Sequence, residues 1–248
     1  MDFYQRGRVD LDMEALGSDT MVKVFDQMRK MRGYVDPDFP GRDWNLATAM
    51  VMRGEAAMQI MGDWAKGEFA AAGLEPGKDY ICASTPSDGG YLLNSDSFAM
   101  FNVSGDDNVE GQALLAELIL GTDFQETFNL YKGSIPARTD VPRGEFDACA
   151  IKSMDDMVSA AEGGTLMGSM AHEIAQAGAI RGAFIDVVTA HFNSDMSSTE
   201  ATEKLVKSIK LAVEATALHE LLRRPDKTRP RRVPHRSPAT EFRCAPAP

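Results

Sequence analysis

The stretch GEAAMQIMGDWA, residues 54–65, decides the fold class. Its first glycine ends a short apolar helix that we expect over residues 46–52. Apolar side chains then alternate along residues 56–61, which predicts a short and mostly buried strand. A further short helix is expected over residues 66–72. Helices that alternate with a few short strands favour an α/β fold over a helical bundle or a β-sandwich.

The rest of the chain is interpreted from two patterns: apolar residues that recur every three or four positions indicate helices, and apolar residues that alternate indicate strands. Two further strands are expected, over residues 80–83 and 97–103. The helix that begins after Ser18 has a methionine-rich face, which we expect to be core because unbranched Met fills irregular gaps. Apolar residues recur every three or four positions in runs that predict helices over residues 19–32, 107–120, 122–130, 146–160, 179–192 and 198–212.

Charge is divided unevenly along the 248 residues, which carry 26 basic and 37 acidic side chains. Residues 221–248 hold seven Arg and one Lys against one Asp and one Glu, a net charge of +6. Residues 1–220 therefore hold 18 basic and 35 acidic side chains, a net charge of −17. Such an acidic body repels nucleic acid and anionic lipid, so we expect no nucleic-acid partner for it.

Several classes of protein are disfavoured by missing motifs. Cys82, Cys149 and Cys244 have no CxxC or Cys/His spacing, so we expect buried or incidental thiols rather than a disulfide framework or a zinc site. The sequence has no phosphate-binding GxxxxGK[ST] and no GxSxG elbow, and we expect no cofactor. No apolar run approaches the roughly 18 residues of a membrane-spanning helix. The first 18 residues lack the apolar centre of a secretory signal, so none is expected there.

Polar residues cluster in four loops, beside aromatic or glycine-rich backbone. Loops at the ends of buried elements are where rigid scaffolds present ligand-binding side chains. An indole face covers the C–H patch of a sugar ring, carboxylates accept hydrogen bonds from hydroxyl pairs, and amide, ammonium and imidazole groups donate them. The loops therefore predict a site for a neutral sugar. Its candidate residues are Asp63, Trp64, Asn94, Asp96, Lys132 and His172.

Each candidate also has an ordinary structural explanation. An isolated Trp64 is typical of a core anchor, Asp96 of a turn or helix cap, and His172 of a hydrogen-bonded structural histidine. The carboxylates of Asp63 and Asp96 leave open a second function, a carbohydrate-active hydrolase, which needs one carboxyl of such a pair to have a raised pKa. The combination of all four loops favours sugar binding.

The run at residues 54–65 resembles the G-x-A-A-M-x-x-x-G-x-W segment of family 1 extracellular solute-binding proteins, the receptors of ABC sugar importers. Three further runs resemble the glucose/mannose-type branch more narrowly: Asp96-Ser97-Phe98, KGSIPAR at residues 132–138, and Ser169-Met170-Ala171-His172. The resemblance implies a helix-rich lobe of a two-lobed periplasmic binding protein of type II-like fold.

The resemblance also implies function. Trp64, Asp96, Lys132 and His172 match positions that line the sugar pocket in that branch. We therefore expect a binding protein without catalysis, cofactor or metal, whose ligand is a monosaccharide such as glucose or mannose. Its partners would be ABC permease subunits in the inner membrane, and its location the periplasm.

Two features depart from the family. Its members have a signal peptide and an N-terminal lobe before the part that resembles this chain. The resemblance covers residues 1–212, whereas residues 213–248 form an unrelated basic, Pro/Arg-rich tail that we expect to be disordered. An N-terminally truncated receptor with impaired binding is therefore expected. A non-functional remnant is one alternative, and a nucleic-acid or membrane-surface role of the tail arginines is another.

Overall fold

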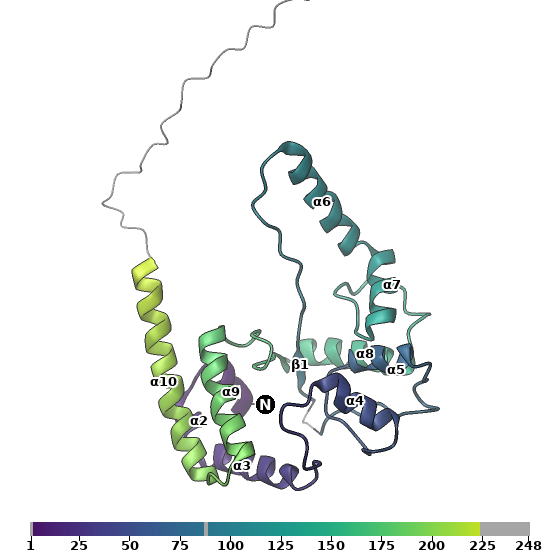
Figure 1. Cartoon of the computed structure of the whole chain (residues 1–248). Coiled ribbons are helices and arrows are strands. Elements are labelled where there is room, and N and C mark those ends of the chain that lie inside the picture. The colour runs from purple at the N-terminus through teal and green to yellow at the C-terminus, as the bar shows by residue number, and fades with distance from the viewer. Residues whose placement is uncertain (1, 87–88, 224–248) are drawn as a thin grey trace, which may run out of the picture.

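The computed structural model describes residues 2–86 and 89–223 (Figure 1). It is helix-rich with one small sheet, which confirms the expected α/β character. Among the helices in these ranges, none combines the length and apolar character that crossing a bilayer requires. The elements are α1 (Asp2–Tyr4), the π-helix η1 (Gln5–Val9), α2 (Met13–Leu16), α3 (Asp19–Arg32), α4 (Trp44–Met52), α5 (Ala65–Ala71), β1 (Tyr91–Leu93), α6 (Asp106–Leu120), α7 (Thr122–Lys132), α8 (Ala148–Glu162), β2 (Leu166–Gly168), α9 (Gly178–Asn193) and α10 (Ser198–Arg223).

The helices α9 and α10 pack side by side, α3 crosses them at one end, and the three hold the main hydrophobic core (Figure 1). Met21 and Phe25 of α3 are almost completely buried, which confirms that the methionine-rich face is core. Phe184 of α9 and Leu205 of α10 belong to the same cluster. We call these three helices the three-helix body.

The last helix, α10, runs past the predicted boundary at residue 212. It begins after Ser197, whose Oγ accepts a hydrogen bond from the backbone N–H of Glu200 (3.2 Å), as the capping-box spacing predicts. It then continues without a break to Arg223, so residues 213–223 are helical. The division between receptor and tail stays a prediction, and residues 224–248 lie outside the described residues.

A second, smaller core lies where α8 begins. Val141, Phe146 and Ala150 form its apolar cluster. Beside it the buried ammonium of Lys66, from α5, contacts both carboxylate oxygens of Asp147 at 2.9 and 3.1 Å. Burial raises the pKa of Asp147, but the hydrogen bonds from Lys66 and from the backbone N–H of Ala150 outweigh it, so the pKa lies below its usual value. The ion pair therefore ties α5 to the first turn of α8.

The sheet consists of β1 and β2, paired in parallel with Tyr91 opposite Leu166 and Leu93 opposite Gly168. The intervening chain carries α8, as the connection between parallel strands requires. Neither strand is predicted from the sequence, because three residues are too few to show a period of two.

The three predicted strands, over residues 56–61, 80–83 and 97–103, are wrong. Apart from a single bridge between Pro76 and Tyr80, these segments have no strand pairing, and most of their apolar side chains are exposed. A strand needs a neighbour that takes up its backbone N–H and C=O groups. No described segment supplies that neighbour, so the apolar alternation marks residues suited to a sheet without producing one.

The prediction of unpaired thiols is also wrong for two cysteines. Cys82 and Cys149 form a disulfide with their Cα atoms 5.9 Å apart. Their separation of 67 residues gives no signal in a search for short cysteine spacings. The bond ties the loop after Tyr80, whose ring stacks on Phe69, to the first turn of α8. Cys244 lies outside the described residues.

Candidate functional site

The loops that follow the two strands leave the sheet at the same edge. Because β1 and β2 are parallel, their carboxyl ends lie together, and the backbone N–H of Ser169 donates to the carbonyl of Leu93 (2.9 Å). Asn94 and Asp96 follow β1, and His172 follows β2. In parallel sheets, ligands bind outside the carboxyl ends of the strands. The fold therefore gathers three of the candidate residues at an edge suited to a ligand.

Trp64 reaches the same edge from the start of α5. Its ring meets that of His172 edge to face, with the centroids 5.4 Å apart and the planes at 84°. Gly62 makes room for the indole, because a Cβ at that position would lie 2.1 Å from the Trp64 ring. Gly62, the second glycine of the 54–65 run, thus has a steric role, and a larger residue there would displace the indole.

The His172 ring is held by the turn after β2. Its Nδ1 and the Oγ of buried Ser169 share a hydrogen bond of 2.8 Å. Tyr4 supports the turn: its hydroxyl donates to the carbonyl of Gly168 (2.9 Å) and accepts from the backbone N–H of Met170 (3.1 Å). The imidazole therefore stands at the surface in an orientation that the protein fixes.

Lys132, Asp96 and Asn94 form a polar cluster. The ammonium of Lys132 makes an ion pair with the carboxylate of Asp96 and lies 5.8 Å from the centroid of the Phe128 ring. The hydrogen bond from Lys132 is the main reason why the pKa of Asp96 is below its usual value, and a hydrogen bond from the Asn94 side chain adds to it. The cluster therefore presents one anionic acceptor between donors, as recognition of hydroxyl pairs requires.

Two glycines set Lys132 beside Trp64. α7 ends at Gly133, which has a left-handed φ of +82°. A Cβ at Gly133 would lie 2.3 Å from the backbone N of Gly67, and a Cβ at Gly67 would lie 2.6 Å from the carbonyl oxygen of Lys132. The end of α7 therefore touches the backbone of α5 directly, one turn from Trp64, which side chains at these positions would prevent.

Asp63 is half-buried and is anchored to α8. Its carboxylate accepts a hydrogen bond from the Oγ of Ser153 on α8 (3.2 Å), and that hydroxyl also contacts the hydroxyl of Tyr91 on β1 (2.9 Å). Burial raises the pKa of Asp63, although Ser153 and the charges of Lys66 and Lys132 lower it in part. Asp63 thus anchors the residue next to it, Trp64, against α8 and β1.

Charge interactions connect these groups. His172 lowers the pKa of Asp96, and Lys132 lowers the pKa of Asp63, so the aromatic pair and the polar cluster belong to one region. Within the described ranges, no three His, Cys, Asp or Glu side chains gather as a metal ion requires. The structure brings all the predicted site residues together: Asp63, Trp64, Asn94, Asp96, Lys132 and His172.

Sequence reasoning missed the residues that support the site. Ser153 lies in the middle of a helix, and Tyr91 begins a strand too short to predict, so neither has a local signal. Tyr4 acts on a turn more than 160 residues away in the chain. These supports follow from tertiary contacts alone.

Comparison with known proteins identifies the family. The model of the bacterial extracellular solute-binding protein family matches residues 5–153. A probable sugar-binding periplasmic protein of Brucella suis is 52% identical over 212 residues, which are 85% of this chain and 50% of that protein. One of Rhizobium meliloti is 50% identical over 212 residues, 85% of this chain and 51% of that protein. An uncharacterized ABC transporter extracellular-binding protein of Pyrococcus horikoshii is 36% identical over 185 residues, 74% of this chain and 41% of that protein.

The chain spans about half the length of the curated relatives it matches. The family match covers more than half of this chain and includes the 54–65 run together with Asn94, Asp96 and Lys132. Three of the four motifs thus lie within the match. This chain therefore belongs to the bacterial extracellular solute-binding protein family.

Proposed function

We propose that this chain is the sugar-binding component of an ABC importer and that its ligand is a monosaccharide such as glucose or mannose. The observation that carries the proposal is the meeting of Trp64 and His172 with the Asp96–Lys132 pair at the carboxyl ends of two parallel strands. The indole covers the apolar face of the sugar ring. The carboxylate accepts from its hydroxyls, and the ammonium and amide donate to its oxygens.

The names of the relatives support the coarser part of this proposal. Those of Brucella suis and Rhizobium meliloti are described as probable sugar-binding periplasmic proteins. The narrower choice of a glucose- or mannose-like ligand rests on the resemblance of the loops around Asp96, Lys132 and His172 to that branch. Permease subunits of the importer are the proposed partners.

A periplasmic location is part of the proposal. The disulfide between Cys82 and Cys149 supports it, because such bonds persist in oxidising compartments such as the bacterial periplasm and are rare in the cytosol. Refolding of the chain with and without reductant, followed by thiol counting, tests whether the bond forms.

The hydrolase alternative is disfavoured. Asp63 has a raised pKa and Asp96 a lowered one, a division that glycosidases use. However, Asp63 is engaged with Ser153, and Asp96 is paired with Lys132. Membership of a solute-binding family favours binding over catalysis. Turnover of an aryl glycoside that Asp96→Asn abolishes would reverse this assignment.

We expect binding by this chain to be weak, with a Kd of about 1 mM or more, because Asp96 and His172 are exposed and water competes for their hydrogen bonds. The sequence has two tryptophans, Trp44 and Trp64, so Trp44→Phe leaves Trp64 as the single indole emitter. Addition of glucose or mannose should then change the tryptophan emission.

Trp64→Ala should abolish sugar binding measured by calorimetry, while the matched variant Trp44→Ala, at a half-exposed site on α4, should keep it. Equal losses in the two variants would contradict the proposed site. Micromolar affinity of the isolated chain would contradict the expected weakness.

A further inference from the structure

Different elements carry the two halves of the candidate site. The indole half is Trp64, at the start of α5, and the carboxylate half is Asn94 with Asp96, after β1. On the surface the halves are connected by the ion pair between Asp96 and Lys132, in which the Asp96 side chain is 65% exposed. Such exposed ion pairs contribute little, because water competes with them. The spacing of the two halves therefore depends on a better protected link.

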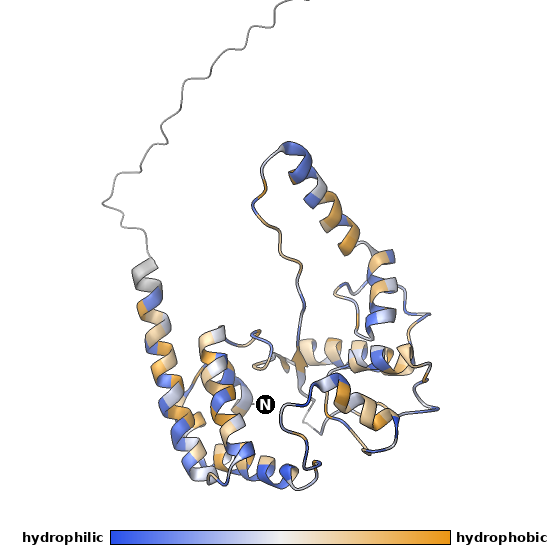
Figure 2. Ribbon diagram, in the orientation of Figure 1, coloured by the Kyte–Doolittle hydropathy of each residue, from blue (hydrophilic) through white to orange (hydrophobic). Residues whose placement is uncertain are grey.

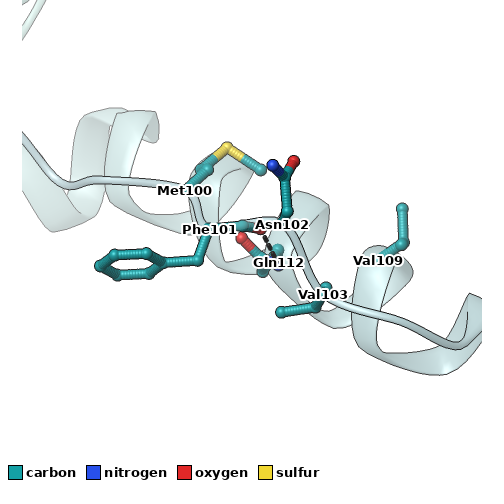
Figure 3. Close-up of a pocket in the computed structure, with 6 residues that line it drawn as sticks. All are labelled: Met100, Phe101, Asn102, Val103, Val109 and Gln112. Atoms are coloured by element: carbon teal, nitrogen blue, oxygen red, sulfur yellow. Dashed lines mark hydrogen bonds between the residues drawn. The ribbon is translucent and has the colours of Figure 1, made fainter. Parts of the chain in front are cut away.

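The chain that follows Asp96 is loosely packed. α6 has no buried residue, and several of the apolar side chains that colour it orange are more than half exposed (Figure 2). The extended segment 97–105 runs past α6 with a hollow of about 280 Å³ between them, and a hydrogen bond from Gln112 Nε2 to the carbonyl of Phe101 (3.0 Å) joins the two (Figure 3). The position of Asp96 is therefore set mainly by the strand that precedes it.

One hydroxyl on α8 contacts the neighbours of both halves. The Oγ of Ser153 donates to the carboxylate of Asp63 (3.2 Å), the residue before Trp64. The same oxygen lies 2.9 Å from the hydroxyl of Tyr91, the first residue of β1. All of these residues are partly buried. Hydrogen bonds to a carboxylate are stronger than neutral ones, and partial burial protects them from water.

The hydrogen bonds of Ser153 have a direction, because its hydroxyl has a single proton. A carboxylate can only accept, so Ser153 donates that proton to Asp63, and Tyr91 must donate to the Ser153 oxygen. Burial raises the pKa of Tyr91 and the charge of Asp63 adds to this, so the phenol keeps the proton that it donates. The three side chains therefore form one continuous hydrogen-bonded unit from Trp64 to β1.

α8 is itself held firmly, as a support for both halves requires. Its first turn is bound to α5 by the ion pair between Asp147 and buried Lys66, and to the loop that contains Cys82 by the disulfide of Cys149. The helix ends shortly before β2, which pairs with β1. A side chain near the middle of α8 is therefore fixed relative to α5 and to the sheet.

We propose that Ser153 is a positioning residue of the site: through Asp63 and Tyr91, its hydroxyl fixes the indole half relative to the carboxylate half. The inference rests on the proposed sugar site, because the spacing of the halves acts on ligand affinity. A ligand that needs both halves binds more tightly when their spacing is fixed in advance, since less ordering is required on binding. The hydroxyl of residue 153, rather than its size, is what the site needs.

The first test detects the hydrogen bond to Asp63 and requires no sugar. In Trp44→Phe, the emission of Trp64 should change as the neighbouring carboxyl of Asp63 titrates. Ser153→Ala removes a hydrogen bond that favours the carboxylate, so the midpoint should move up by at least about half a pH unit. Ser153→Thr, which keeps a hydroxyl, should retain the midpoint of the unsubstituted protein.

Other charged groups face Asp63 and Trp64, so the titration needs a control. Burial raises the pKa of Asp63, and the charges of Lys66 and Lys132 partly oppose this in every variant. The His172 ring contacts the indole and also titrates. Asp63→Asn should remove the transition of the carboxyl and leave that of the imidazole, which distinguishes the two.

The second test measures glucose and mannose affinity by the emission of Trp64. Ser153→Ala should weaken binding at least about five-fold, because the two halves lose their fixed spacing. Ser153→Thr should restore most of the affinity. The matched control is Ser159→Ala, at an exposed position of the same helix, which should change neither the affinity nor the midpoint.

Two results would overturn the proposal. One is a midpoint that Ser153→Ala leaves unchanged, whether or not sugar binds. The other is unaltered sugar affinity in Ser153→Ala, or an equal loss of affinity in Ser153→Thr. A shifted midpoint together with no monosaccharide binding by the unsubstituted chain would refute the proposed ligand, while it would support the role of Ser153 in holding the residue next to Trp64.

Discussion

The three-helix body and the arm, which consists of the extended segment 97–105 and α6, have similar sequence patterns but differ in the burial of their apolar side chains. In the body, Phe25, Leu205 and Ile209 are completely buried. In the arm, Phe101 and Leu118 are 76% and 61% exposed although they too belong to segments with many apolar residues. Hydrophobic periodicity thus predicts that a helix or extended segment forms. It does not say whether this chain provides the surface that covers it.

The largest expected effect comes from one substitution made in both regions. Phe25→Ala should lower the free energy of unfolding by about 3–5 kcal/mol, because it opens a cavity in the packed core. Phe101→Ala should change it by less than about 0.5 kcal/mol, since the ring is already in water. Urea denaturation followed by circular dichroism measures both. Similar losses in the two variants would mean that the arm is covered in the isolated chain.

The disulfide, which joins the loop after Tyr80 to the first turn of α8, should have the next largest effect. Its reduction should lower the free energy of unfolding by about 2–4 kcal/mol, because the Cys82–Cys149 bond closes a long loop in the unfolded chain. The loss should concentrate in α5 and α8, whereas amides of the three-helix body keep their slow exchange. Denaturation of the Cys82→Ser, Cys149→Ser double variant checks this, and an unchanged midpoint would show that noncovalent contacts suffice.

A smaller effect is expected from acid, and it should arise in the body. His191 on α9 is fully buried against the Phe25 ring (4.7 Å), and among the described residues neither ring nitrogen has a hydrogen-bond partner. Burial lowers its pKa, the positive charges of Arg29 and Arg32 lower it further, and Asp26 partly opposes them. In the unfolded chain His191 therefore binds a proton near pH 6.5, whereas in the folded chain it binds one only at lower pH.

The free energy of unfolding should consequently be constant, as far as His191 is concerned, above about pH 7 and fall as the pH drops through 6.5. In His191→Phe, which keeps an aromatic ring beside Phe25, the decline between pH 7 and pH 5 should be shallower. Urea midpoints at three pH values measure the slope. Parallel slopes in the two proteins would exclude His191 as the titrating group.

Helices could be predicted from the sequence because their hydrogen bonds are local. The expected ends of the helix at residues 19–32 agree with α3, and Gly33 and Gly121 end helices where expected. The strands could not be predicted for the opposite reason. Whether residues 97–103 pair depends on a partner that the segment itself does not encode, and the real strand at Tyr91 was too short to show a pattern.

The candidate site could be predicted further than the sheet. Trp64, Asp96, Lys132 and His172 came from family motifs, and the structure brings them together. The motifs do not reveal what holds them, such as the Ser153 hydroxyl between Asp63 and Tyr91, because such contacts join distant parts of the chain. The sugar-binding role of the cluster stays a prediction until binding is measured.

The direct contact between Gly67 and Gly133 has a practical consequence for protein engineering. The backbones at the start of α5 and the end of α7 touch directly, so no side chain sets the spacing of the backbones that carry Trp64 and Lys132. Replacing the side chain of Trp64 or Lys132 should therefore leave the backbone of the other residue in place. A library that varies positions 64 and 132 while it retains both glycines can search for new ligand preferences, and so for biosensors, without rebuilding the scaffold.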